Sequence, residues 1–508
     1  MPSKIKTFEE LEKILEEEKK EGEKIVHCHG VFDLLHPGHI RHFKEAKKQG
    51  TKLVVSLTPD RFVNKGPGRP AFNETLRAET LAALNCVDYV VLNDTPDAVH
   101  CIQKIKPNVY VKGKEYSDHT KDITGKIADE VRAVQEGNGT VYYTDDIVFS
   151  SSSLLNQHFE NTNPKLRALL AEIKETYSID DLIHKVDALK DLRVLIIGDA
   201  IIDEYQFTEP MGQSGKGLHM VARNRENECY LGGSLIIANH IAQFSDHVSL
   251  LTSIGQNCPH QTMIHEMVNP KVKKEFVYLP NHSTLTKKRY VMKDGTRLSK
   301  LFETYSTNDS LLTDKETEQI IKYLREETKD FDLILVCDFG NGFTNPLIID
   351  ALCDLPNFLA INTQTNSGNR GFNVVTHYRR ADCISLNEPE LRLSAHDRYS
   401  SMDGLACDIS EFLSCSNTFI TQGVRGVYCF SEDESEIHIP ALVTNTIDRV
   451  GAGDSFFAIA AMCAAKGYPL AISGFLGSIA SAINVQIVGN KEPIKKTSFN
   501  KFLTRLLK

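Results

Sequence analysis

Short apolar runs alternate with helical patterns along this chain, and the alternation stops once and then starts again. In the first part, runs with the length of strands occupy 24–32, 52–57, 87–92, 109–113 and 140–144. Helical patterns near 39–49, 73–85, 96–105 and 125–136 separate these runs. Because strands that alternate with helices form a parallel sheet covered on both faces, this part predicts an α/β domain.

The alternation resumes after a polar, helical segment that begins near a serine run at 150–153. The next strand-like run lies at 193–199, and later ones lie at 248–255, 331–340, 357–362, 381–387 and 417–423. The chain of 508 residues has room for two or three domains. We therefore expect two α/β domains, at 1–160 and 191–508, joined by a helical linker at 161–190.

A hairpin pattern interrupts the second series of strands. The segment 286–303 turns at Asp294-Gly295, a pair that favours a tight turn between antiparallel strands. We expect a small β lid over the second sheet.

The composition is that of an ordinary globular protein, with 25% charged and 41% hydrophobic residues and a net charge of −9. The negative charge argues against a nucleic-acid partner, and no apolar run approaches the roughly 20 residues of a membrane span. The N-terminal segment is too charged for a signal peptide, and its Thr7 and Glu10 have the spacing of a capping box. The 12 cysteines are scattered, so we expect reduced core residues in a cytoplasmic protein.

The segment GVFDLLHPGH at 30–39 follows the first long strand and leads into a helix. Open α/β sheets bind ligands at the carboxyl ends of their strands, and a helix N-terminus suits phosphate. His36 and His39 would flank such a site and donate hydrogen bonds to it. The same spacing also allows a zinc site, which would need further ligands, or a loop without a role.

This segment resembles the signature of the nucleotidyltransferase superfamily that includes cytidylyltransferases and sugar-phosphate adenylyltransferases. Matching segments follow at 64–70, 73–84, 107–116 and 149–153. The resemblance implies a Rossmann-like parallel sheet, catalysis by His36, His39 and Lys65, and nucleotide contacts from Gly30, Phe32, Asp33, Arg77, Lys112, Ser150, Ser151 and Ser152. The serines have a structural alternative as helix caps. In the implied reaction a phosphate oxygen of the acceptor attacks the α-phosphorus of a nucleoside triphosphate, with Mg²⁺, and pyrophosphate leaves.

The segment DRVGAGDSFFAIAA at 448–461 presents a second site for phosphate chemistry. Gly451, Ala452 and Gly453 open a helix, so their N–H groups are able to hold a developing negative charge. Asp454 lies in the first turn, where it would accept a proton from an attacking hydroxyl. A favourable charge at a helix start is the structural alternative.

This second part resembles the ribokinase-like, or PfkB, sugar kinases, which implies an α/β/α sandwich with a small β lid. The resemblance implies Asp454 as the base and the ATP-dependent phosphorylation of a sugar hydroxyl. It also implies sugar contacts from Asp203, Gly232, Gly233, Arg289 and Arg370, ATP contacts from Gly423, Gly426, Gly451, Ala452 and Gly453, and Mg²⁺ ordered by Asn387 and Glu390. Two positions depart from the heptose kinases of this family. Ile236 stands where those kinases carry an asparagine, and Asn362, Thr363 and Gln364 replace an Asp-Pro-Lys.

A kinase and a nucleotidyltransferase in one chain are able to perform consecutive steps. The pair resembles the bifunctional heptose-7-phosphate kinase/heptose-1-phosphate adenylyltransferase family, with the order of the domains reversed. That resemblance implies that a sugar phosphate, ATP and a nucleoside triphosphate are converted to an ADP-heptose-like nucleotide sugar, and it allows a homodimer. The alternative is a cytidylyltransferase for a phosphorylated sugar or alcohol, joined to a degenerate kinase domain that only binds a ligand. His29 and Glu115 also depart from the family pattern near the first site.

Overall fold

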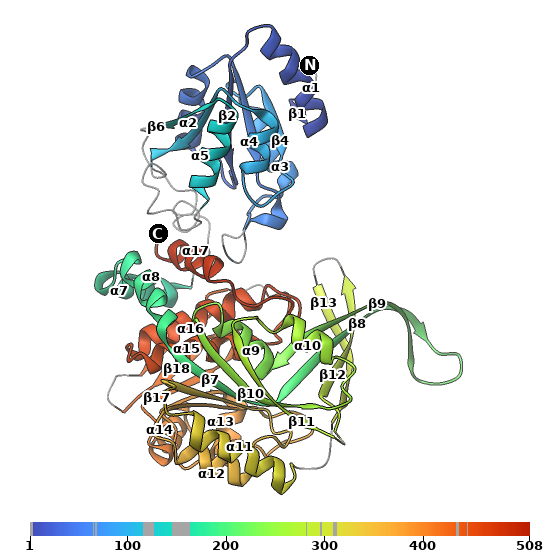
Figure 1. Ribbon diagram of the computed structural model, residues 1–508, viewed down its shortest axis with the longest axis vertical. Coiled ribbons are helices and arrows are strands. Elements are labelled where there is room, and N and C mark those ends of the chain that lie inside the picture. The colour runs from blue at the N-terminus through green and yellow to red at the C-terminus, as the bar shows by residue number, and fades with distance from the viewer. Residues whose placement is uncertain are drawn as a thin grey trace. The chain divides into compact units, whose positions relative to one another are not determined.

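The computed structural model describes residues 4–63, 66, 69–114, 126–144, 163–280, 282–294, 297–307, 312–432, 436–443 and 446–508. The chain divides into two compact units, Met1–Thr162 with Asn500–Lys508, and Asn163–Phe499 (Figure 1). Each unit has its own sheet and its own core. The segment expected to link two domains forms α7 (Pro164–Thr176) and α8 (Ile179–Asp187), which belong to the second unit.

The first unit is a parallel six-stranded sheet in the order β1-β4-β3-β2-β5-β6. Its strands are β1 (Ile5–Lys6), β2 (Ile25–Gly30), β3 (Lys52–Leu57), β4 (Tyr89–Leu92), β5 (Val109–Gly113) and β6 (Thr140–Thr144). Its helices are α1 (Phe8–Lys20), α2 (Pro37–Lys48), α3 (Glu74–Ala82), α4 (Val99–Ile105) and α5 (Ile127–Glu136). The Thr7–Glu10 capping box begins α1, as the sequence predicts.

Alternating side chains of the central strands bury both faces of this sheet. Val26 and Cys28 of β2 pack with Phe43 of α2 and Leu81 of α3. Ile25 faces the other side, with apolar residues of α1 and α4. The sheet therefore has two helix-covered faces.

The second unit is built on a nine-stranded sheet in the order β11-β10-β7-β14-β15-β16-β17-β18-β19. These strands are β7 (Arg193–Gly198), β10 (His247–Gly255), β11 (Val272–Leu279), β14 (Leu333–Asp338), β15 (Phe358–Thr363), β16 (Cys383–Asn387), β17 (Asn417–Thr421), β18 (Val427–Phe430) and β19 (Ile437–Ile439). Neighbours from β11 to β17 pair in parallel, and β18 pairs antiparallel with both of its neighbours.

Helices cover both faces of this sheet, which makes an α/β/α sandwich (Figure 1). One layer contains α9 (Ser234–Ile241), α15 (Ala452–Ala465) and α16 (Leu470–Asn484), and the other contains α11 (Asp314–Glu327), α12 (Pro346–Cys353), α13 (Glu388–Ser394) and α14 (Met402–Leu413). The remaining described α-helices of the chain are α10 (Gln261–Met267) and α17 (Lys496–Leu506).

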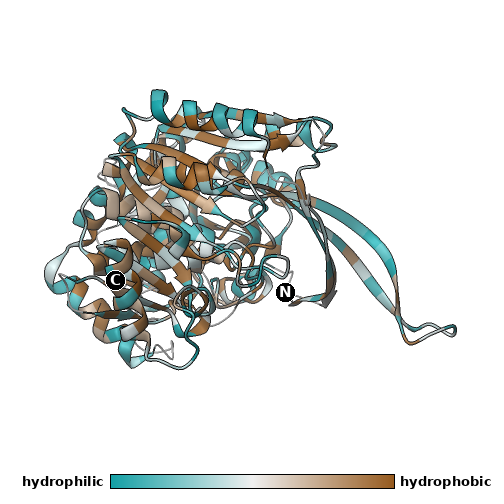
Figure 2. Cartoon of the chain, turned by 90° about the horizontal axis from the view of Figure 1, so that it is seen from below, coloured by the Kyte–Doolittle hydropathy of each residue, from teal (hydrophilic) through white to brown (hydrophobic). Residues whose placement is uncertain are grey.

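A four-stranded lid sheet projects from the second unit in the order β13-β12-β8-β9. The expected hairpin is present as β12 (Leu285–Asp294) and β13 (Arg297–Ser306), which pair antiparallel. The structure adds a longer hairpin, β8 (Ala200–Gln213) and β9 (Met220–Gly233), whose outer part is mostly hydrophilic and extends away from the sandwich (Figure 2). The lid is therefore larger than the sequence predicts.

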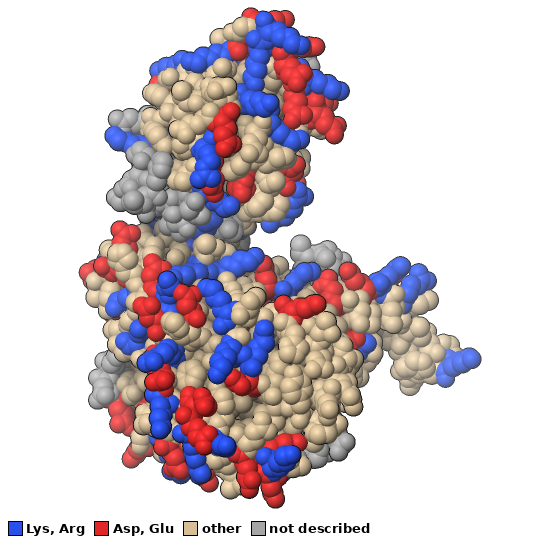
Figure 3. Space-filling view, in the orientation of Figure 1, with Lys and Arg blue, Asp and Glu red and all other residues tan. Residues whose placement is uncertain are grey.

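The visible surface carries Lys and Arg side chains beside Asp and Glu on both units (Figure 3). Among the described residues, no helix combines the length and the apolar character that crossing a bilayer requires.

Candidate active sites

The 30–39 loop lies at a change of direction in the first sheet. From β2 the chain continues to β3 on one side, and it later places β5 on the other side of β2. Such a switch point leaves a crevice beyond the carboxyl end of the central strand. The loop and the N-terminus of α2 border this crevice.

His36 and His39 lie together at this point. Their ring centroids are 3.9 Å apart. His36 is the N-cap of α2, and its Nδ1 accepts a hydrogen bond from the Gly38 N–H at 3.2 Å. Because Nδ1 is the acceptor, the proton of a neutral ring lies on Nε2.

The Nε2 atom of His36 is buried and has no hydrogen-bond partner among the described residues, and burial lowers the pKa of the ring. His36 therefore presents a neutral N–H donor that a ligand would satisfy. Within the described ranges, no group of three or more His, Cys, Asp or Glu side chains is placed to hold a metal ion, so those residues form no zinc site around the pair.

Phe32 and Asp33 shape the loop. Phe32 has a left-handed φ of 46°, and its ring meets His39 edge-on at 5.5 Å. The Asp33 carboxylate is buried and accepts hydrogen bonds from Arg69 Nη1 at 2.9 Å and from the Ala71 N–H at 2.6 Å. These contacts tie the 30–39 loop to the 69–72 segment, and a nucleotide contact of either residue stays a prediction.

Arg77 is a buried residue of α3, with 2% of its surface exposed. Its guanidinium donates to the carbonyls of Val31, Thr58 and Phe72 and pairs with Asp60. These partners give Arg77 a structural role, because it joins the loops after β2 and β3. The nucleotide contact that the resemblance implies for it stays a prediction.

Lys112 also has a protein partner, since its Nζ lies 2.8 Å from Glu130 Oε2. His29, at the end of β2, contacts the hydroxyl groups of Ser56 at 2.8 Å and Thr58 at 3.3 Å. Lys65, Glu115, Ser150, Ser151 and Ser152 lie outside the described residues.

Asp454 occupies the first turn of α15 in the second unit. The N-cap, Gly451, has a left-handed φ of 77°, and no side chain caps the helix. The Ala452 N–H donates to the Arg449 carbonyl at 3.4 Å, whereas the N–H groups of Gly453 and Asp454 have no partner among the described residues and stay available to an anion. Burial, with the charge of Asp203 in addition, raises the pKa of Asp454 to about 7.

Asp203 of β8 faces the same region. Its Oδ1 atom pairs with Arg289 of β12, and its Oδ2 atom accepts a hydrogen bond from Asn490 Nδ2 at 3.2 Å. A Cβ atom at Gly232 would lie 2.6 Å from Asp203 Oδ2, so glycine lets β9 pass close to this carboxylate. Gly233, with a φ of 56°, turns the chain from β9 into α9.

Lys287 is a residue of this site that sequence reasoning missed. It is 6% exposed, and burial lowers its pKa, while its ammonium interacts electrostatically with Asp203, Asp454 and Asp199. The sequence could have revealed it, because side chains alternate between the two faces of a strand. Lys287 and Arg289 are two residues apart and therefore share one face of β12. Lys288 faces the other way and pairs with Glu204.

A pocket lies between β16, β17 and the N-terminus of α15. Of the residues predicted to bind ATP or Mg²⁺, Asn387, Gly423, Gly426, Ala452 and Gly453 line it. Much of the remaining wall is apolar, with Leu442, Phe456 and Val485 among its residues. Such a combination of apolar wall and free backbone donors suits a nucleotide.

Asn387 and Glu390 form the capping box of α13. Asn387 Oδ1 accepts the Glu390 N–H, and Glu390 Oε2 accepts the Asn387 N–H at 2.8 Å. Glu390 Oε1 accepts the Thr365 N–H at 3.0 Å. Burial raises the pKa of Glu390 to about 7, and the charge of Asp454 adds to this shift.

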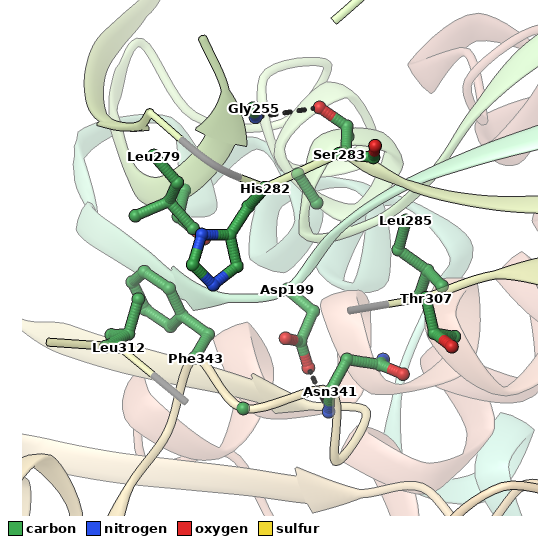
Figure 4. A pocket seen from close by; sticks show the side chains of 14 residues that line it. Asp199, Gly255, Leu279, His282, Ser283, Leu285, Thr307, Leu312, Asn341 and Phe343 are labelled. Carbon is green, nitrogen blue, oxygen red and sulfur yellow. Dashed lines mark hydrogen bonds between the residues drawn. The ribbon is translucent and has the colours of Figure 1, made fainter. Parts of the chain in front are cut away.

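A second, small cavity lies beside Asp199, at the ends of β7, β10 and β14 (Figure 4). Asp199 Oδ2 accepts the N–H groups of Phe339 at 3.0 Å and Asn341 at 3.4 Å. Burial, with the charge of Asp338 in addition, raises the pKa of Asp199 to about 7. The other polar lining residues among those described are Ser253, His282, Ser283, Thr284, Thr307 and Asn341.

Asparagine side chains of the amide-rich segment 365–373 bind it to the end of β14. Asn366 and Asn369 donate to the carbonyl of Phe339, and Asn373 donates to the carbonyl of Asp338. Arg370 is exposed in this loop, and its predicted sugar contact stays a prediction. Ile236 is 1% exposed within α9, where an asparagine would have to find a partner in the core or in the ligand.

Comparisons with known proteins agree with the two folds. The pfkB family carbohydrate kinase model matches residues 191–497, and the cytidylyltransferase-like model matches residues 27–226. These domains imply kinase and nucleotidyltransferase activities.

Two curated relatives are the bifunctional protein HldE of Geobacter metallireducens, 40% identical over 153 residues, and that of Aliarcobacter butzleri, 43% identical over 140 residues. The alignments cover 29% and 27% of this chain, and 31% and 29% of the relatives. The chain thus spans less than a third of the length of these relatives.

Phosphofructokinase-2 from Escherichia coli, in a crystal structure with substrates and products, shares the fold of the second unit. It has 13% sequence identity and a TM-score of 0.51, over 62% of this chain and 100% of that chain. By the match over 191–497, this chain belongs to the pfkB family of carbohydrate kinases.

Proposed function

We propose that the chain is a bifunctional enzyme that makes a nucleotide-activated sugar. The second unit transfers the γ-phosphoryl group of ATP to a hydroxyl of a sugar phosphate. The first unit joins a sugar 1-phosphate to a nucleotide and releases pyrophosphate, and the product resembles ADP-heptose. The observation that carries the proposal is that one chain holds two helix N-termini equipped for phosphate chemistry, with Asp454 at one and His36 at the other.

In the kinase reaction, Asp454 accepts the proton of the attacking sugar hydroxyl. A pKa of about 7 leaves a large fraction of this carboxylate ionised near neutral pH, while keeping it basic enough to take a proton. The N–H groups of the first turn of α15 stabilise the charge of the transferred phosphoryl group. Lys287, on the lid strand beside Asp454, adds a positive charge to the same region.

Mg²⁺ fits the carboxylates near this helix. Glu390 lies close enough to Asp454 for the charge of Asp454 to raise its pKa, and a bound cation would stabilise both groups in the ionised form. Glu390, with Asn387 beside it, would hold the ion through oxygen atoms. When bound, Mg²⁺ neutralises the charge of the ATP phosphates.

The cavity beside Asp199 supports a sugar rather than a second phosphate as its occupant. None of the described residues that line it is a lysine or an arginine, whereas hydroxyl, amide and imidazole groups line much of it (Figure 4). Such groups pair with the hydroxyls of a sugar. The phosphate of the sugar substrate would instead be bound by Arg289 and Lys287 of the lid.

In the transferase reaction, a phosphate oxygen of the acceptor attacks the α-phosphorus of a nucleoside triphosphate, and the bond to pyrophosphate breaks. His36 donates its Nε2 proton in a hydrogen bond to an oxygen of the α-phosphate as charge develops there. His39 lies beside it and acts in the same way. No covalent intermediate with the enzyme is needed.

Separate assays of the two activities test this function. The purified chain is incubated with ATP, Mg²⁺ and a panel of sugar phosphates that includes heptose 7-phosphate, and ADP formation is followed. In parallel, nucleoside triphosphates are offered with sugar 1-phosphates that carry or lack a second phosphate, and pyrophosphate is measured. We expect both products, and the absence of both across the panel would refute the proposal.

A cytidylyltransferase joined to a kinase domain that only binds a ligand is the second candidate. Ile236 and Gln364 favour it, because they replace polar or charged residues of the heptose kinases. Pyrophosphate release with CTP, without ADP formation from any sugar, would support this candidate over the first.

A further inference from the structure

We propose that Arg449 binds the polyphosphate of the nucleotide in the pocket next to α15. This inference rests on the proposed kinase function and adds to it a residue that the family motif does not account for. Arg449 lies two residues before Gly451, at the start of the turn that leads into the helix.

Arg449 is the single charged residue among the described residues that line the pocket between β16, β17 and the N-terminus of α15. The other lining residues are glycines, apolar side chains and neutral polar side chains. A nucleoside triphosphate brings several negative charges into this space. Backbone N–H groups of α15 offset part of that charge, and a guanidinium is the side chain best suited to offset more of it.

The guanidinium of Arg449 is uncommitted. No hydrogen bond or ion pair joins it to another described residue, and the side chain is exposed to the pocket and to solvent. The nearby Arg425 differs, because it is paired with Glu388. The adjacent carboxylate of Asp448 is also engaged elsewhere, since Oδ2 accepts hydrogen bonds from Tyr205 and from the Gly489 N–H.

The backbone of Arg449 is nevertheless held in place. Asp448 Oδ1 accepts the Arg449 N–H at 2.8 Å and the Val450 N–H at 3.2 Å. Asp448 is buried, so these bonds fix the base of the side chain beside the helix N-terminus. Because its backbone is fixed and its guanidinium is free, Arg449 is able to bind a phosphate without a rearrangement of the loop.

Hydrogen exchange measured by mass spectrometry tests the inference on the full chain, because it reports each site separately. Peptides within 446–465 report the kinase pocket, and peptides within 25–48 report the transferase site. Protection is titrated with Mg²⁺ and a non-hydrolysable ATP analogue, with ADP, and with adenosine. The variants are Arg449→Gln, Arg449→Lys and, as a control on a distant exposed arginine, Arg398→Gln.

We expect Arg449→Gln to weaken binding of the ATP analogue and ADP about tenfold to a hundredfold at 446–465, the loss typical of a hydrogen bond to a charged group. Adenosine binding and protection at 25–48 should not change, and Arg449→Lys should restore part of the affinity. Arg398→Gln should match the wild type.

Equal affinity of Arg449→Gln and wild type for the ATP analogue would overturn the inference and leave the kinase proposal intact. An equal loss for adenosine would show that Arg449 only supports the loop, which also overturns it. A wild-type chain without nucleotide protection at 446–465 would instead refute the kinase proposal itself.

Discussion

In the proposed mechanism, the two units use a helix N-terminus for phosphate chemistry in different ways. In the first unit the side chain of His36 caps α2, so one imidazole both completes the helix and presents a donor at Nε2. In the second unit no side chain caps α15, and Asp454, the proposed acid–base group, lies inside the first turn. The comparison teaches that structure and chemistry are combined in one residue at the first site and separated at the second.

Among the substitutions that test this comparison, Asp454→Asn should cause the largest loss of activity. The substitution keeps the shape of the side chain and removes the base, so the kinase rate should fall by about 10²- to 10⁴-fold. Pyrophosphate release from a supplied sugar 1-phosphate should stay at the wild-type rate. A parallel loss of both activities would contradict the assignment of Asp454 to the kinase reaction alone.

His36→Asn separates the two roles of His36. Asparagine is a good N-cap, so the thermal stability should stay near that of the wild type, whereas the donor at Nε2 is lost. The transferase rate should fall by about 10²- to 10³-fold, with ADP formation by the kinase unchanged. If the transferase retains its full rate, His36 acts only as a cap.

Arg77→Met tests whether Arg77 is a structural residue. Three backbone carbonyls would lose their donor, and Asp60 would lose its partner. We expect the first unit to lose about 2–4 kcal/mol of its free energy of unfolding, measured by denaturant titration. Arg132→Met, at an exposed position of α5, is the matched control. A stable variant with a raised KM for the nucleotide would indicate a nucleotide contact instead.

The smallest expected effect is a difference between the two activities in their dependence on pH. Because the pKa of Asp454 is raised to about 7, its basic form is lost as the pH falls through 7. The kcat/KM of the kinase for its sugar should then fall about tenfold per pH unit below that point. Burial lowers the pKa of His36 below its ordinary value, so its neutral form persists to lower pH than that of an ordinary histidine and the transferase rate should fall less steeply just below pH 7. Identical profiles would contradict this difference.

Most of the central strands could be predicted from the sequence because they are short apolar runs separated by helical patterns. The runs at 52–57, 109–113 and 140–144 coincide with β3, β5 and β6. The short edge strand β1 and the long β8–β9 hairpin were missed. The outer part of the hairpin is exposed, so it shows no alternation of buried and exposed residues, and the inner part carries polar residues such as Asp203 at buried positions.

The sequence predicted a site residue correctly only where a motif identifies the residue and no other structural role explains the same spacing. His36 and Asp454 lie where their motifs imply. The N-x-x-E spacing of Asn387 and Glu390 is also the spacing of a capping box, so sequence alone does not separate the two roles. The burial of Arg77 depends on loops far apart in sequence, and Lys287 is recognised only by its register with Arg289.

The central claim is that one chain performs both phosphoryl and nucleotidyl transfer. Phosphorus NMR on the wild-type chain with ATP, Mg²⁺ and the sugar phosphate that it turns over tests this most directly. The account predicts that ADP and a sugar bisphosphate, with a new phosphate signal at the 1-position, appear first in the kinase step. When a sugar 1-phosphate and nucleoside triphosphates are supplied, the account predicts a nucleoside diphosphate sugar and pyrophosphate. Pyrophosphate without any sugar 1-phosphate from ATP would contradict the kinase half, and ADP without pyrophosphate would contradict the transferase half.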